Sequence, residues 1–303
     1  MKVYQIDFFK NRKSIVNNVL PLNILETINE LSELVGSPEY NRTPEFINKD
    51  KYKKKRNDTY DIDNLSISRT IINKKIGIQK EIDSIRILIN KLTENQYKTI
   101  SNTIKEKINT ISESYSFEEC NILADQLFNM FFTNLLFSNI YSILIKDLYN
   151  YNFIKNTLQL NLDKFLDIYN ENKNKEYKDK LSFDEVSMMN KNFDKNKGMA
   201  LLFVNLLIND VIDKNIIINF INTLINLFFE LTNLPDKKMH VDELSEILFI
   251  LINKSFNIIK NDESWEDIEN NIIYISNMKA NNRLSISNKS IFKFMDLKDE
   301  INI

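Results

Sequence analysis

Two residue types that often carry out catalysis occur only once each in this sequence. His240 is the single histidine and Cys120 the single cysteine, so a Cys–His pair would require two separate segments to meet. The sequence contains no HExxH, paired-histidine or GxxxxGK[ST] pattern, which would mark a zinc or phosphate site. We expect His240 to be a turn or cap residue and Cys120 to be a small apolar residue. The sequence therefore predicts no catalytic residue, no metal and no cofactor, and a protein that is not an enzyme.

A basic run points to binding instead. The segment KYKKKR consists of Lys51, Tyr52, Lys53, Lys54, Lys55 and Arg56. Its positive side chains attract phosphates, and its tyrosine can stack on a base as in single-strand binders. We predict RNA binding by this run, with a solubilising linker as the alternative. The formal net charge of -2 means that such binding would be local to this patch.

Three aromatic side chains lie close to the first residue, in MKVYQIDFFK. They are Tyr4, Phe8 and Phe9. If the segment is helical, Tyr4 and Phe8 lie one turn apart with Phe9 beside them, the spacing of helix-in-groove anchors. The alternative is that the three aromatics pack onto the chain's own helices.

The elements that would position these residues are helices. With three glycines and four prolines in 303 residues, the chain has few of the residues that sheets and tight turns use, which favours an all-α fold. Apolar residues recur at helical spacing, and Pro21 and Gly36 bound the first helix. The predicted helices cover residues 22–35, 78–92, 95–111, 117–132, 137–151, 154–169, 198–212, 215–234, 241–259, 265–278 and 290–301. Residues 170–195 are predicted to be a polar, charged segment between helices.

Short breaks between the helices from residue 80 onward predict antiparallel hairpins. Five hairpins of about 35–45 residues match the repeat length of HEAT-type solenoids. We predict an all-α, HEAT-repeat-like α-solenoid, with an irregular bundle as the alternative. The expected divisions are an aromatic segment at 1–20, a short helix and basic linker at 21–79, and the solenoid at 80–303.

The stretch 215–234 is apolar enough to imitate a membrane span. Asn219, Asn222, Asn226 and Glu230 align along one face of it, which favours a core helix of a soluble protein. The early apolar run is interrupted by charges and does not form a signal peptide. We therefore expect a cytoplasmic protein.

The most specific stretch is SIRILINKLTENQYKTIS at 84–101. It resembles the first helical hairpin of the middle domain of eukaryotic translation initiation factor 4G, with the pattern R-x-I-L-N-K-L-T-x-x-x-F. Three further segments are similar to that family in the same order: LLFSNIYSIL at 135–144, KNKGMALLFVNLLINDVI at 195–212 and KFMDLKDEI at 293–301. The resemblance covers residues 80–303 and implies five stacked HEAT hairpins, in a compact or viral form of the factor.

The resemblance implies a scaffold that binds a DEAD-box helicase of the initiation factor 4A type, holds it in an active geometry and contacts RNA. The positions that correspond to helicase binding are Ile89, Asn90, Lys91, Leu92, Thr93 and Tyr97. The segment KNKGM departs from the family's arginine-rich pattern, and the polar segment 170–195 also differs. The family's motif for the cap-binding factor 4E, Y-x-x-x-x-L-Φ, implies the same role for Tyr4, Phe8 and Phe9, with Phe9 in place of leucine.

Two other functions remain open at this point. HEAT modules also occur in splicing and mRNA-decay adaptors, which would bind a related helicase. A helical protein–protein interaction scaffold unrelated to RNA is the third class. In each case we expect a monomer within a hetero-complex.

Overall fold

Every regular element in the described chain is a helix. The computed structural model describes residues 21–35, 76–173 and 182–303, and the chain divides into two units, residues 1–71 and 72–303. The first unit contributes α2 (Leu22–Val35), which has the bounds that its apolar spacing and Pro21 predict. The all-α prediction is confirmed.

The second unit contains ten α-helices and three short 3-10 helices within its described residues. They are α3 (Ile78–Ile89), η3 (Glu94–Gln96), α4 (Tyr97–Ser114), α5 (Phe117–Thr133), η4 (Leu135–Phe137), α6 (Ser138–Leu148), α7 (Asn152–Lys173), α8 (Phe183–Ile208), α9 (Lys214–Thr232), α10 (Lys238–Ile259), α11 (Trp265–Ser276), η5 (Ala280–Asn282) and α12 (Asn288–Ile301).

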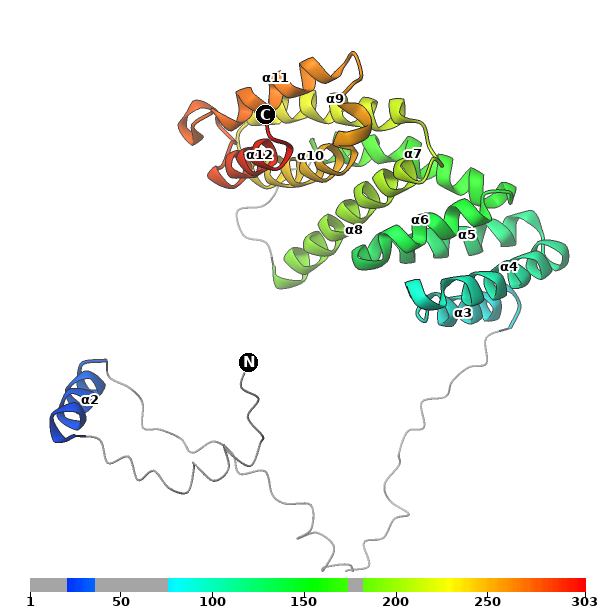
Figure 1. Cartoon of the computed structure of the whole chain (residues 1–303), viewed down its shortest axis with the longest axis horizontal. Coiled ribbons are helices and arrows are strands. Elements are labelled where there is room, and N and C mark those ends of the chain that lie inside the picture. The colour runs from blue at the N-terminus through cyan, green and yellow to red at the C-terminus, as the bar shows by residue number, and fades with distance from the viewer. Residues whose placement is uncertain (1–20, 36–75, 174–181) are drawn as a thin grey trace, which may run out of the picture. The chain divides into compact units, whose positions relative to one another are not determined.

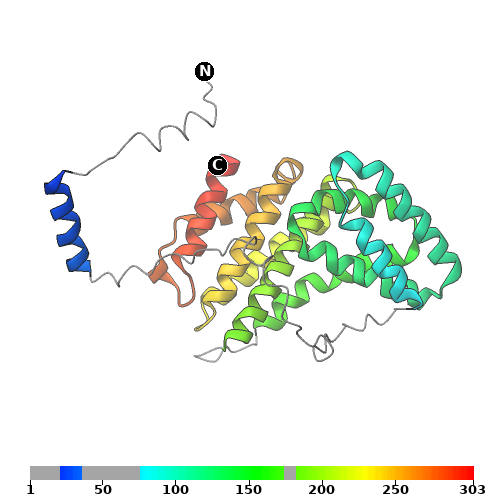
Figure 2. The same ribbon diagram turned by 90° about the horizontal axis from the view of Figure 1, so that it is seen from below.

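These helices stack as consecutive pairs in two layers (Figures 1 and 2). The first helices of the pairs, α3, α5, α7, α9 and α11, each contact the next in one layer, and the second helices, α4, α6, α8, α10 and α12, do the same in the other. The pairs follow one another from α3–α4 at one end to α11–α12 at the other. This is the predicted HEAT-repeat-like α-solenoid of about five antiparallel hairpins.

Local side-chain caps fix where several of these helices begin. Ser116 accepts a hydrogen bond from the backbone N–H of Glu119, whose carboxylate accepts one from the backbone N–H of Ser116. The same reciprocal capping box joins Ser182 and Glu185 at the start of α8. Each box satisfies donors that the first helical turn leaves unpaired.

The start of α8 corrects the prediction for residues 170–195. The helix begins at Phe183, whereas a polar segment had been predicted up to residue 195 and a helix only from 198. The first turns of α8 are largely exposed and so carry no continuous apolar stripe. The capping box and the packing of the later turns stabilise this polar portion as a helix.

Helix α9 is the one helix of the described chain that is by itself long and apolar enough to cross a membrane. In the solenoid it packs against α10, α7, α8 and α11. Its apolar residues, such as Ile221 and Phe228, are fully buried, whereas Asn219, Asn226 and Glu230 are exposed. The asparagine stripe therefore faces outward from a helix that contributes to the core.

The centre of the solenoid is an aromatic cluster beneath a close helix crossing. Phe132 of α5, Phe165 of α7, Phe203 of α8 and Phe220 of α9 pack with ring centroids 4.8–6.1 Å apart. Directly beside it, Gly198 of α8 lies against the backbone of α5, where a Cβ atom would fall 1.7 Å from the carbonyl oxygen of Phe132. Only glycine permits this approach.

Substituting this glycine tests the crossing. Gly198→Ala should lower the free energy of unfolding by about 1–3 kcal/mol, because α8 must move away from α5 to admit the methyl group. Elsewhere in a helix, a Gly→Ala substitution raises the free energy of unfolding by up to about 1 kcal/mol. A decrease for Gly198→Ala would therefore indicate the close contact with α5. Urea unfolding measures the change, with Asn192→Ala on the exposed part of α8 as the control. Unchanged or increased stability of Gly198→Ala would contradict the close contact.

Candidate binding sites

The first candidate surface is the turn of the first helix pair, which carries the residues matched to helicase binding. Helix α3 ends at Ile89, with Asn90 as its C-cap. Ile89 and Leu92 are 2 % and 1 % exposed and belong to the core, whereas Asn90, Lys91 and Thr93 are exposed. A partner can therefore contact the three polar residues directly, and the two apolar residues shape the turn from beneath.

Tyr97 joins this turn to the next helix pair. Its hydroxyl donates a hydrogen bond to Oδ2 of Asp147 on α6 at 2.9 Å, and Nζ of Lys105 lies 3.0 Å from the same oxygen. Burial, followed by the hydrogen bond to Asp147, raises the pKa of Tyr97 well above its usual value. The phenol therefore remains a neutral donor and fixes the start of α4 against α6.

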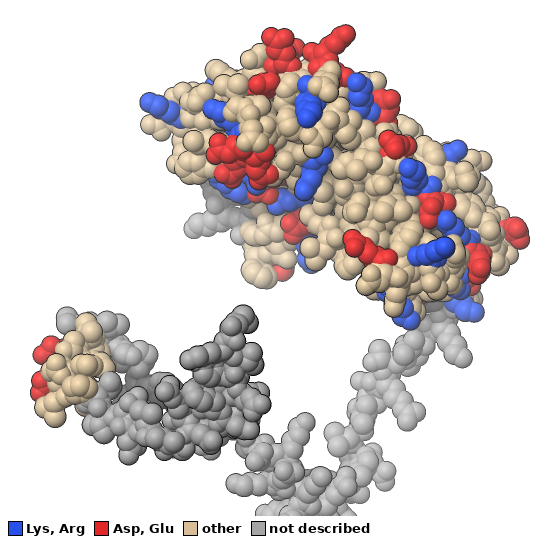
Figure 3. Space-filling view, viewed as in Figure 1, with Lys and Arg blue, Asp and Glu red and all other residues tan. Residues whose placement is uncertain are grey.

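The other predicted binding residues lie outside the described residues. These are the aromatic residues Tyr4, Phe8 and Phe9 and the basic run 51–56. On the face of the solenoid in Figure 3, basic and acidic side chains are interspersed. This face carries no extended basic surface of the kind that a nucleic-acid backbone requires.

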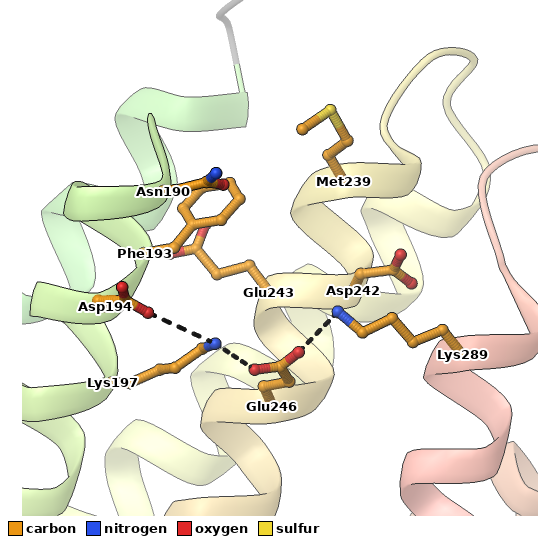
Figure 4. A pocket seen from close by; sticks show the side chains of 9 residues that line it. All are labelled: Asn190, Phe193, Asp194, Lys197, Met239, Asp242, Glu243, Glu246 and Lys289. Carbon is orange, nitrogen blue, oxygen red and sulfur yellow. Dashed lines mark ion pairs between the residues drawn. The ribbon is translucent and has the colours of Figure 1, made fainter. Parts of the chain in front are cut away.

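The second candidate is a cavity of about 420 Å³ between α8, α10 and α12 (Figure 4). Asn190, Phe193, Asp194 and Lys197 line it from α8, Met239, Asp242, Glu243 and Glu246 from α10, and Lys289 from α12. It therefore spans three successive helices of one layer. No group of three or more metal-ligating side chains occurs in the described residues.

An ion-pair bridge crosses the floor of this cavity. The carboxylate of Glu246 pairs with Lys197 of α8 on one side and, at 2.7 Å, with Lys289 of α12 on the other. Burial raises the pKa of Glu246, but the hydrogen bonds and charges of the two lysines outweigh it and hold this pKa below its usual value. Lys197 also lies 4.0 Å from Oδ1 of Asp194, so both lysines of the cavity are already paired with carboxylates.

Glu243 lies one turn earlier on α10 and has a different environment. It is 4 % exposed and reaches from α10 toward α8 (Figure 4). Its Oε1 accepts a hydrogen bond from Nδ2 of Asn196 at 2.7 Å. Burial raises the pKa of Glu243 to about 7, against the opposing effects of Asn196 and Lys197. The group can therefore change its charge near neutral pH.

Glu243 is an acidic residue on the buried face of a helix. In VDELSEILFILI it falls four residues before Ile247 and eight before Leu251, both of which are fully buried. A charged residue within the apolar stripe of a helix was the signal. His240 also lies within the first turn of α10 and is buried, rather than preceding the helix.

The comparisons with known proteins identify no relative. No protein-family model matches the chain, and no curated protein is similar to it.

The environment of Glu243 predicts a pH-dependent stability. Folding raises the pKa of Glu243 from 4.5 to about 7. The free energy of unfolding therefore falls as pH rises from 4.5 through 7, and the total loss above pH 7 is about 3 kcal/mol. Glu243→Gln keeps the acceptor for Asn196 and removes the charge. The variant should match the wild type at pH 4 and be more stable by up to about 3 kcal/mol at pH 8.

Urea unfolding at both pH values measures this difference. Glu266→Gln, which replaces an exposed carboxylate on α11, is the control and should leave the pH profile unchanged. A difference between Glu243→Gln and the wild type that stays constant from pH 4 to pH 8 would show that Glu243 does not titrate in this range.

Proposed function

We propose that the chain is a binding scaffold of the initiation factor 4G middle-domain type, whose partner is a DEAD-box helicase of the initiation factor 4A type. The main support for this proposal is the solenoid. Its helix pairs have the number and order implied by the four segments that resemble the middle domain. In this function the scaffold performs no chemistry of its own. It favours the arrangement of the helicase lobes that is competent for ATP and RNA.

The order of the resembling segments supports this proposal. Residues 84–101 contain the end of α3, the turn with η3 and the start of α4, and 135–144 contain η4 and the start of α6. Residues 195–212 include the buried part of α8, and 293–301 lie in α12. Each segment thus occupies a different level of one continuous stack.

The exposed turn of the first pair supports it further. Asn90, Lys91 and Thr93 present polar groups at the end of the described stack, and the hydrogen bond between Tyr97 and Asp147 holds that turn in place. Contact through a rigid, pre-ordered turn loses little entropy on binding.

The wider proposal includes RNA, the cap-binding factor 4E and a cytoplasmic location. RNA binding rests on the basic run 51–56 and factor 4E binding on Tyr4, Phe8 and Phe9, so both rest on the sequence. The same solenoid would suit a splicing or mRNA-decay adaptor for a related helicase, or a scaffold unrelated to RNA. The identity of the stimulated helicase separates these functions.

The first test is the ATPase rate of an initiation factor 4A-type helicase with and without the full chain. The chain should raise the rate, and Lys91→Glu should weaken its apparent affinity roughly tenfold by reversing a charge at the contact. Lys254→Glu, an exposed lysine on α10, is the matched control and should behave as the wild type. Absence of both stimulation and co-elution would refute helicase binding, and equal effects of the two variants would exclude the turn as the contact.

A second test addresses the N-terminal aromatics. The chain should be retained on a cap-analogue resin loaded with factor 4E. Tyr4→Ala combined with Phe9→Ala should abolish retention, because this variant lacks the two aromatic side chains that would fill the groove of the partner. Retention by the double variant equal to that of the wild type would assign these aromatics to packing within the chain.

A further inference from the structure

We propose that the cavity between α8, α10 and α12 binds the side chain of an arginine or lysine presented by a partner protein, with Glu243 as its carboxylate acceptor. This inference goes beyond the proposed function and does not depend on which helicase, if any, the chain binds.

The charges of the lining residues select a cation. Four carboxyl groups, on Asp194, Asp242, Glu243 and Glu246, face two ammonium groups, on Lys197 and Lys289. Both ammonium groups pair with Glu246. A phosphate or carboxylate ligand would meet an excess of negative charge, whereas a cation would be attracted.

Glu243 is the group for which a cation would provide the missing partner. It is almost fully buried, lines the cavity and forms no ion pair within 4 Å with any residue that the structure describes. Its one hydrogen bond comes from the neutral amide of Asn196, and the nearby charge of Lys197, which pairs with Asp194 and Glu246, compensates its charge only in part. Placing a charge in such a site is costly unless an opposite charge joins it.

The walls above Glu243 suit the apolar stem of a basic side chain. Phe193 and Met239 line the cavity together with Glu243, Phe193 from α8 and Met239 from α10 (Figure 4). Arginine and lysine bury their methylene groups against apolar surface, and a guanidinium group is attracted to an aromatic face. The volume of about 420 Å³ lies within the usual range of ligand pockets, about 300–1,000 Å³.

Several groups set the proton affinity of Glu243. Tyr169 of α7 approaches it, and the buried position of this tyrosine together with the charge of Glu243 raises the tyrosine's pKa. Asn196 and Lys197 of α8 favour the charged carboxylate, whereas Glu246 on its own helix opposes it. His240 lies one turn earlier on α10, and Lys289 lines the cavity from α12.

This environment makes cation binding depend on pH. The ligand must meet the deprotonated carboxylate, and the pKa of Glu243 is about 7. The deprotonated fraction, and with it the apparent affinity, should therefore rise about tenfold from pH 6 to pH 8. Arginine and lysine side chains stay charged throughout this range, so the change reports on the cavity.

The test is an NMR titration of the full chain carrying ¹³C-methyl methionine, with Nα-acetyl-arginine amide and Nα-acetyl-lysine amide as probes. The signal of Met239, at the cavity wall, should shift saturably, and that of the buried Met278 beyond α11 should not. Nα-acetyl-citrulline amide has the shape of the arginine probe without its charge and should bind at least tenfold more weakly.

Two variants complete the design. Glu243→Gln should abolish the tenfold pH dependence and most of the binding, whereas Glu266→Gln should bind as the wild type does. If the free Glu243→Gln variant has the same methionine methyl spectrum as the free wild type, the variant is folded. Equal binding of the arginine and citrulline probes, undiminished binding by Glu243→Gln, or no shift of Met239 with either cationic probe would overturn the proposal.

Discussion

The contact of Gly198 with the carbonyl of Phe132 is the constraint on which the middle of this solenoid depends. It brings α8 against α5 at backbone distance, and Phe203, one and a half turns later, then packs between Phe132 and the aromatics of α7 and α9. A larger residue at 198 would separate these rings. Because α8 also packs extensively against α6 and α10, its position sets the spacing between the earlier and later helix pairs.

Asparagines then fix the register of α8. Asn205 and Asn209 donate to Ser138 and Ser142 of α6, each at 2.9 Å. Both pairs are spaced by four residues, so the two bonds form together only when the helices are aligned along one face. Asn196 makes the corresponding bond toward α10. These three asparagines have structural roles, since an unpaired amide in these helix contacts would be costly.

The sequence predicts the helices well where apolar residues form a continuous stripe at helical spacing, as they do in α2, α9 and α10. It fails where that stripe is absent, since the first turns of α8 are helical despite their polar composition. The Ser182–Glu185 capping box was a readable signal for that start. The cavity was harder to predict, because its residues come from three helices that only the stacking brings together. Within α10, Glu243 lies on the same apolar stripe as Ile247. This charged residue within the stripe was the one sequence signal that a polar site replaces part of the core there.

The placement of the two candidate surfaces follows from the solenoid itself. In a stack whose levels contact mainly their neighbours, a local change is transmitted weakly along the chain. The turn at 90–93 lies in the terminal pair, whereas the cavity is built from α8, α10 and α12, so the two sites can be occupied independently. Helix α8, in the third pair, contacts α5 and α6 of the second pair and α10 of the fourth, and it also carries Asn196 and Lys197 of the cavity. A ligand that draws the wall of the cavity together would therefore act on a helix that packs against the pairs on both sides of it.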